Sequence, residues 1–161
     1  MTEKTRIKLE NVISKFPSEY RESFRNIIEY VISLGYNPKV NAGETYADFV
    51  KNKHGKVIMK IENGYEKPPM PKLPRMNIRL DALPVLAGIF QEAILHFKES
   101  HCLKCGKCDG KYGLKYILLN GKEVYTCRHT IYIPSFNADN ITIIKETLKL
   151  QDEYLIKHYS T

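Results

Sequence analysis

Four cysteines lie within 26 residues of this 161-residue chain, and no other property of the sequence limits its fold as strongly. They are Cys102, Cys105, Cys108 and Cys127. A C-x2-C-x2-C run with a fourth cysteine after a hairpin can place four sulfurs at the corners of a tetrahedron, about 2.3 Å from a zinc ion. Four thiolates leave no open coordination position. We therefore predict one structural zinc ion in a loop over 101–128.

Two other uses of these cysteines remain open. An iron–sulfur motif would continue with a Cys-Pro pair where this chain has Tyr112-Gly113. A thioredoxin-type redox pair needs a helix N-terminus, whereas Cys102 and Cys105 follow the end of a predicted helix. Three histidines could also replace one cysteine as a ligand: His96, His101 and His129. A thiol or iron–sulfur redox protein is kept as an alternative hypothesis, although the first two observations argue against it.

The net charge of +7 is concentrated in two segments. Residues 49–79 carry eight Lys/Arg against two Asp/Glu, and residues 98–130 carry seven against three. The second excess can balance a zinc–thiolate site, whose net charge is about −2. In the first, aromatic residues lie between the cations, which is typical of a strand face that binds nucleic acid. A nucleic-acid-binding protein that uses segment 49–79 is therefore a second alternative hypothesis. Its candidate contacts are Lys51, Lys53, Lys56, Arg75 and Arg79.

Apolar residues at helical spacing predict four helices. The first contains Leu9 and Phe16, and the second runs from an N-cap at Ser18 to a left-handed C-cap at Gly35. A third follows Asp81 and continues to residue 98. The last begins near Ser135 or Asn137 and continues past Leu155.

Short β-rich runs separate these helices. Runs 46–50 and 57–61 predict a hairpin, run 76–80 alternates like a strand, and Asn120-Gly121 joins runs 114–119 and 122–133 in a second hairpin. Four prolines make 65–75 an extended loop. We therefore predict a single α+β domain over 1–161, with an antiparallel sheet of about five strands covered by about four helices. Any pocket would lie between the sheet and helix 82–98, near the proline-rich loop.

Function is less constrained than fold. The sequence has no nucleophile elbow, Walker loop, His-Glu-x-x-His or dinucleotide-binding glycine motif. It also has no apolar run long enough to cross a bilayer and no signal-peptide stretch, so we expect a cytoplasmic protein. These observations favour a zinc-containing binding module without catalytic activity, with a small molecule or nucleic acid as its unknown partner.

About the first 100 residues resemble the YdhG-like family of small uncharacterised bacterial proteins. The resemblance rests on Phe16-Pro17 leading into a helix that contains Arg21, and on the run Arg75-Met76-Asn77-Ile78-Arg79. It implies an α+β fold, in agreement with the pattern above. It implies no biochemical role, and the cysteine segment departs from the family pattern.

Overall fold

The computed structural model describes residues 1–64, 73–82, 88–100, 114–127, 130–133 and 136–159. Its helices there are α1 (Glu3–Ser14), α2 (Ser18–Ser33), α3 (Ile89–Ser100), α4 (Ile141–Tyr159) and a short 3-10 turn over Ala138–Asn140. Its strands there are β1 (Asn37–Val40), β2 (Tyr46–Val50), β3 (Val57–Asn63), β4 (Pro74–Arg79), β5 (Leu114–Ile117), β6 (Glu123–Thr126) and β7 (Thr130–Ile133).

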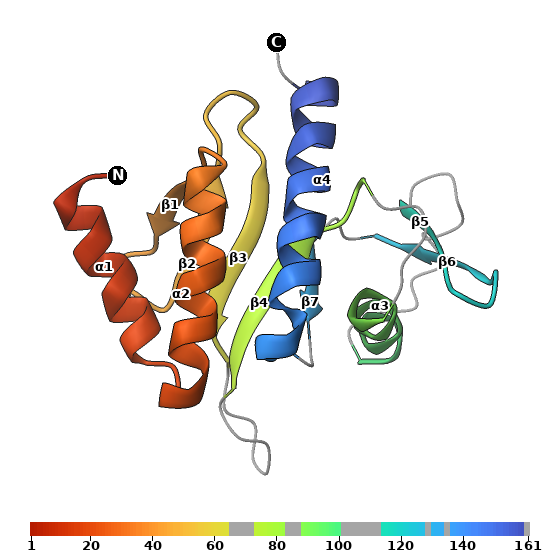
Figure 1. Cartoon of the computed structure of the whole chain (residues 1–161), viewed down its shortest axis with the longest axis horizontal. Coiled ribbons are helices and arrows are strands. Elements are labelled where there is room, and N and C mark those ends of the chain that lie inside the picture. Colours follow the sequence, from red (N-terminus) through yellow and green to blue (C-terminus); the bar gives the residue numbers. More distant parts are fainter. Residues whose placement is uncertain (65–72, 83–87, 101–113, 128–129, 134–135, 160–161) are drawn as a thin grey trace.

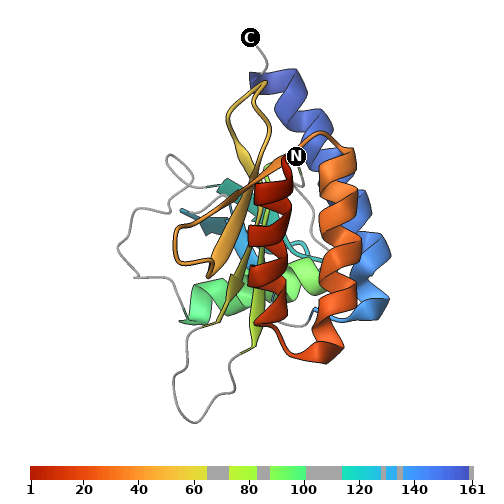
Figure 2. The ribbon, with the colours of Figure 1, turned by 90° about the vertical axis from the view of Figure 1, so that its left-hand side faces the viewer.

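Five of these strands form one antiparallel sheet in the order β1-β2-β3-β4-β7, and β5 pairs only with β6. The predicted α+β class, the antiparallel sheet of about five strands and the four helices are thus confirmed. Figure 1 shows α1, α2 and α4 side by side in front of the sheet, and Figure 2 shows all three on one side of it. Helix α3 runs across the direction of α4 and packs against β7.

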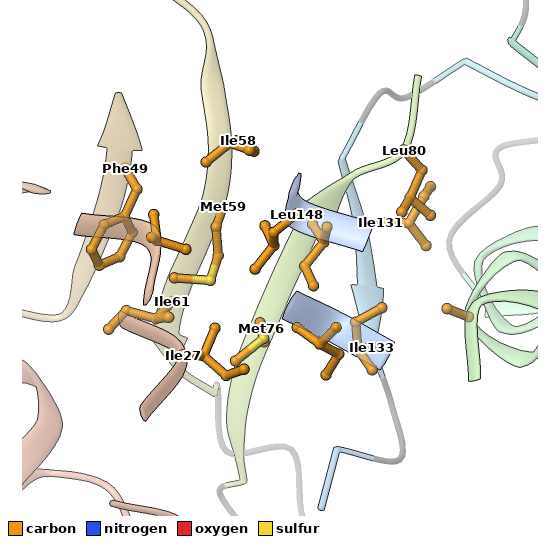
Figure 3. Packing of buried hydrophobic residues seen from close by; sticks show 14 of the residues in the cluster. Ile27, Phe49, Ile58, Met59, Ile61, Met76, Leu80, Ile131, Ile133 and Leu148 are labelled. Carbon is orange, nitrogen blue, oxygen red and sulfur yellow. The ribbon is translucent and has the colours of Figure 1, made fainter. Parts of the chain in front are cut away.

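The two faces of the sheet differ because side chains alternate along each strand. Met76 and Ile78 of β4 are fully buried, and their register partners are also apolar and buried. Figure 3 shows this layer beneath Ile27 of α2 and Leu148 of α4. Arg75, Asn77 and Arg79 alternate with these residues, so they lie on the opposite, polar face. That face carries the candidate site described below.

Local sequence explains how the first two helices join. Gly35 has φ of 91°, and its N–H bonds the Ile32 carbonyl at 2.9 Å, so the predicted left-handed end of α2 is confirmed. Arg21 donates to the carbonyls of Ser14 and Phe16, both at 2.8 Å, and thereby satisfies the end of α1. The predicted N-cap is wrong: Pro17 occupies the cap position, and Ser18 begins the helix without a capping bond.

The second predicted hairpin is confirmed only in its first half. Gly121 has φ of 79° in the turn, and Leu118 N–H bonds the Lys122 carbonyl at 2.9 Å. However, the predicted run 122–133 is not one strand, because β6 ends at Thr126 and β7 pairs with β4 in the other sheet. Inward positions change from even numbers at Val124 to odd numbers at Ile131, a change that a regular strand without a bulge does not make.

Two further elements differ from expectation. Helix α3 begins at Ile89, later than predicted, after Gly88 in a turn with φ of 52°. Residues 83–87, where the sequence predicts the start of this helix, lie outside the described residues. Strand β1, which contains Pro38, was not predicted. Pro38 is tolerated there because β1 is the edge of the sheet. The start of α4 agrees with prediction: the Asn137 side chain caps the 3-10 turn that leads into it.

Candidate functional site

A cavity of about 80 Å³ lies between the polar face of the sheet and α3. The predicted location between the sheet and this helix agrees with the cavity, whereas residues 65–72 of the proline-rich loop lie outside the described residues. Strands β3, β4 and β7 and helix α3 contribute the lining. The lining residues are Glu62, Arg75, Asn77, Ala93, His96, Phe97, Thr130 and Tyr132. We call this the Arg75 cavity.

The strand register builds the floor of the Arg75 cavity. Arg75 lies opposite Glu62, and Asn77 lies opposite Tyr132, so all four share the polar face. Ala93, His96 and Phe97 occur at helical spacing and present one face of α3 to them. The ring of His96 packs against the ring of Tyr132, with centroids 5.9 Å apart. The cavity therefore has a polar floor and a partly apolar wall.

Arg75 is the residue with the most unused bonding capacity in this cavity. Its guanidinium lies 5.5 Å from the centre of the Tyr132 ring. Within the described ranges it has no hydrogen bond and no ion pair. Burial raises the pKa of the Tyr132 phenol, and the charge of Arg75 partly opposes that shift. The phenol is therefore neutral at physiological pH and can donate a hydrogen bond.

The carboxylate in the lining is already engaged. Glu62 accepts from Lys60 Nζ at 2.7 Å and from Asn77 Nδ2 at 3.3 Å. Lys60 also lies over the Tyr46 ring, 4.4 Å from its centre. Because Lys60 balances the charge of Glu62, the positive charge of Arg75 is not balanced by that carboxylate.

A second polar cluster joins the β2–β3 turn to α4. Tyr36 donates to Asp152 Oδ1 at 2.9 Å, and Lys51 Nζ bonds the two oxygens of that carboxylate at 2.8 and 3.0 Å. His54 Nε2 lies 3.3 Å from the Tyr36 oxygen, while His54 Nδ1 accepts from Lys56 N–H at 3.1 Å. We call Tyr36, Lys51, His54 and Asp152 the Asp152 cluster. Its hydrogen bonds form one chain only if neutral His54 carries its proton on Nε2.

Burial determines the electrostatics of the Asp152 cluster. The Tyr36 side chain is almost fully buried, and this burial, followed by the nearby Asp152 carboxylate, raises the pKa of its phenol far above the usual value. Partial burial, followed by the charge of Lys51, lowers the pKa of His54, although Asp152 opposes the shift. Tyr36 therefore stays protonated and His54 stays neutral at physiological pH.

The five residues predicted to contact nucleic acid do not share one surface. Lys51 is paired with Asp152, and Arg79 is paired with Asp81 at 2.7 Å; both pairs are largely buried. Lys53 is exposed in the β2–β3 turn, and Lys56 nearby lies over the Tyr159 ring. Arg75 lies at the other end of β4, in the cavity. The described cations of segment 49–79 are therefore divided between two ends of the sheet.

Of the four cysteines predicted to bind zinc, the structure describes Cys127. It lies directly after β6, is exposed and forms no disulfide. Cys102, Cys105 and Cys108, together with His101 and His129, lie outside the described residues. Among the described residues, no group of three His, Cys, Asp or Glu side chains is arranged for a metal ion. The zinc site stays a prediction.

Comparisons with known proteins add no identity. No family model matches the chain, and neither a curated protein nor a solved structure is significantly similar to it. The resemblance to the YdhG-like family stays a prediction. In the part of the chain that the structure describes, no helix is long and apolar enough to span a membrane.

Most residues of the Asp152 cluster and of the Arg75 cavity were not predicted from the sequence. Tyr36 and Asp152 are 116 positions apart, and no local spacing relates them. Thr130 and Tyr132 reach the cavity only because β7 pairs with β4 and not with the neighbouring hairpin. A usable signal did exist for Arg75 and Asn77, because they alternate with apolar Met76 and Ile78.

Proposed function

We propose that this protein is a non-catalytic binding module that holds a small ligand in the Arg75 cavity and a structural zinc ion in its cysteine loop. The cavity carries the ligand part of the proposal. A buried or half-buried cation without a protein partner is costly, and a bound ligand would supply the missing partner. In the lining, Arg75 is half-buried and its guanidinium has no hydrogen-bond or ion-pair partner among the described residues.

The zinc part is supported by the spacing of Cys102, Cys105 and Cys108 and by the exposed, unpaired thiol of Cys127. A four-thiolate site would contribute on the order of 10–16 kcal/mol on binding, enough to offset the entropy cost of ordering the loop. The ion would be structural, since four protein ligands leave no position for a substrate.

Elemental mass spectrometry on protein purified without added metal tests the zinc part. We expect one zinc per chain and no visible absorption bands. Cys127→Ser should lose zinc and unfold at a lower temperature, whereas Lys122→Ala, in the exposed turn of the same hairpin, should retain it. Iron with visible charge-transfer bands, or no metal and four titratable thiols, would overturn this part in favour of redox chemistry.

The ligand part is tested by a fragment screen on the full-length, metal-loaded chain, observed by ¹⁵N NMR. We expect fragments to shift the backbone amides of Ala93, His96, Thr130 and Tyr132, which surround the cavity. Amides of the Asp152 cluster are the internal control and should not move. If no fragment of any charge shifts the cavity amides, the proposal that this cavity binds a ligand is wrong.

A further inference from the structure

We infer that the ligand of the Arg75 cavity is a small carboxylate. This inference rests on the proposed function, since it names the chemistry of a ligand for that same cavity. It follows from the shape of the donors, from the net charge of the lining and from the size of the space.

The donors match a carboxylate in shape. Arg75 presents a planar fork of N–H groups that is free of protein acceptors within the described residues. Such a fork binds a carboxylate through two parallel hydrogen bonds. The Tyr132 ring centre lies 5.5 Å from the guanidinium carbon, and this cation–π contact uses none of the N–H groups as hydrogen-bond donors. The edges of the guanidinium therefore remain available to a ligand.

The backbone next to Arg75 is shaped to leave this edge accessible. A Cβ built on Gly64 would lie 2.2 Å from the Leu73 carbonyl oxygen and 3.5 Å from Arg75 Nε. No side chain fits at position 64 without moving the backbone. Glycine thus lets the chain before β4 come close to β3 beside Arg75 while adding no bulk next to its guanidinium.

The charge of the lining favours a monoanion. Arg75 contributes one positive charge, and the charge of Glu62 is balanced by Lys60 at 2.7 Å. A dianion such as phosphate would bring a second negative charge beside Glu62, and the described lining offers no second unpaired Lys or Arg to balance it. A carboxylate would be neutralised by Arg75 alone. Asn77, Thr130 and Tyr132 add polar groups around it.

The size of the space limits the rest of the ligand. The cavity volume of about 80 Å³ is well below the roughly 300–1,000 Å³ of pockets for drug-sized molecules. It suits a molecule of a few heavy atoms. Ala93 and Phe97, both buried on α3, form the apolar part of the wall. A short aliphatic group on the carboxylate would pack against them.

An NMR titration of the full-length, metal-loaded chain tests the inference with matched probes. Acetate and propionate are compared with their neutral analogues acetamide and propionamide, and with inorganic phosphate. We expect the carboxylates to shift the amides of His96, Thr130 and Tyr132 and the amides of equal size to bind at least tenfold more weakly. Arg75→Met should weaken carboxylate binding at least tenfold, and Arg75→Lys should do so less. Lys53→Met, at the exposed turn, should have no effect.

Four outcomes would overturn the inference. Equal binding of carboxylates and their neutral amides, or unchanged binding by Arg75→Met, would show that the charge is not recognised; the cavity would still be a ligand site. Tighter binding of phosphate would replace the carboxylate by a phosphate group. If carboxylates fail while other fragments in the screen above shift the cavity amides, the inference fails and the proposed function stands.

Discussion

The Asp152 cluster and the Arg75 cavity contain similar residue types but use them in opposite ways. In the Asp152 cluster, hydrogen bonds join the cation and the phenol to the carboxylate, and join the imidazole to the phenol. In the Arg75 cavity, the carboxylate is engaged by Lys60 and Asn77, while the guanidinium lies over a tyrosine ring and has no hydrogen-bond or ion-pair partner among the described residues. The first arrangement is complete within the protein. For the second, we propose that a ligand supplies the missing partner.

The largest effect should come from breaking the Asp152 cluster at its centre. Asp152→Ala leaves the charge of Lys51 without a partner in a site where the two side chains are 16% and 10% exposed. Removal of one member of a buried pair costs about 3–5 kcal/mol. Urea unfolding should show a loss of this size. Glu153→Ala, at the next and exposed position of α4, is the control and should change stability by less than about 0.5 kcal/mol.

A loss below about 1 kcal/mol for Asp152→Ala would contradict this interpretation. It would mean that Lys51 finds solvent or another acceptor in the variant. The cluster would then not be what holds α4 to the β2–β3 turn.

A smaller effect should follow from removing only the phenol. Tyr36→Phe keeps the ring in the core but removes the hydrogen bond to Asp152 and the contact with His54. A hydrogen bond to a charged group contributes about 1.5–3 kcal/mol, so urea unfolding should show a loss in this range. Tyr125→Phe, whose exposed phenol bonds Glu123, is the matched control and should be nearly neutral. If the two variants lose the same unfolding free energy, burial does not strengthen the hydrogen bond between Tyr36 and Asp152.

The Asp152 cluster should also make stability depend on pH through His54. Its pKa is lowered in the folded state by burial and by Lys51, with smaller effects from Arg79 and Lys56, while Asp152 opposes them. The folded state therefore binds fewer protons than the unfolded state just below the unfolded pKa of about 6.5. The stability that comes from neutral His54 is present above that pH and is lost as pH falls through this range.

The measurement for this prediction is the unfolding free energy at pH 7.5 and pH 5.5. The natural chain should lose more stability over this interval than His54→Gln, which cannot titrate at position 54. The difference between the two slopes isolates His54 from the other four histidines, which are present in both chains. Parallel slopes would show that protonated His54 is accommodated without cost.

The fold was more predictable than the Asp152 cluster or the residues of the Arg75 cavity, because the sequence patterns that specify helices and turns are local. The helical stripe of α2, the left-handed Gly35 and the Asn120-Gly121 turn each lie within a few residues of the structure they specify. Even the place of the cavity could be predicted, since an amphipathic helix next to an alternating strand must pack on that strand's sheet. The pairing of strand β7 was harder to predict, because its partner β4 is about 50 residues earlier in the chain.

The functional assignments of individual lysines and arginines could not be made from the sequence. Lys51, Lys53 and Arg75 all belong to one basic segment, yet one is in a buried ion pair, one is in an exposed turn and one lines a cavity. These outcomes depend on what α4, α3 and β7 bring to each cation. Net charge reports how many cations a segment has, but not which of them lack a partner.

The smallest effect on stability should come from Arg75, and it separates the two regions most directly. Arg75→Met removes a cation that has no carboxylate partner in the described part of the chain, so only the contact with Tyr132 is lost. An interaction of this kind contributes about 0.5–1 kcal/mol, and the apolar side chain recovers part of it by packing. Lys51→Met is the reference, since it leaves Asp152 buried with Tyr36 alone, and it should cost several-fold more. If the two variants destabilise the protein equally in urea, Arg75 is a structural residue, because a cation held for a ligand can be removed from the free protein at little cost.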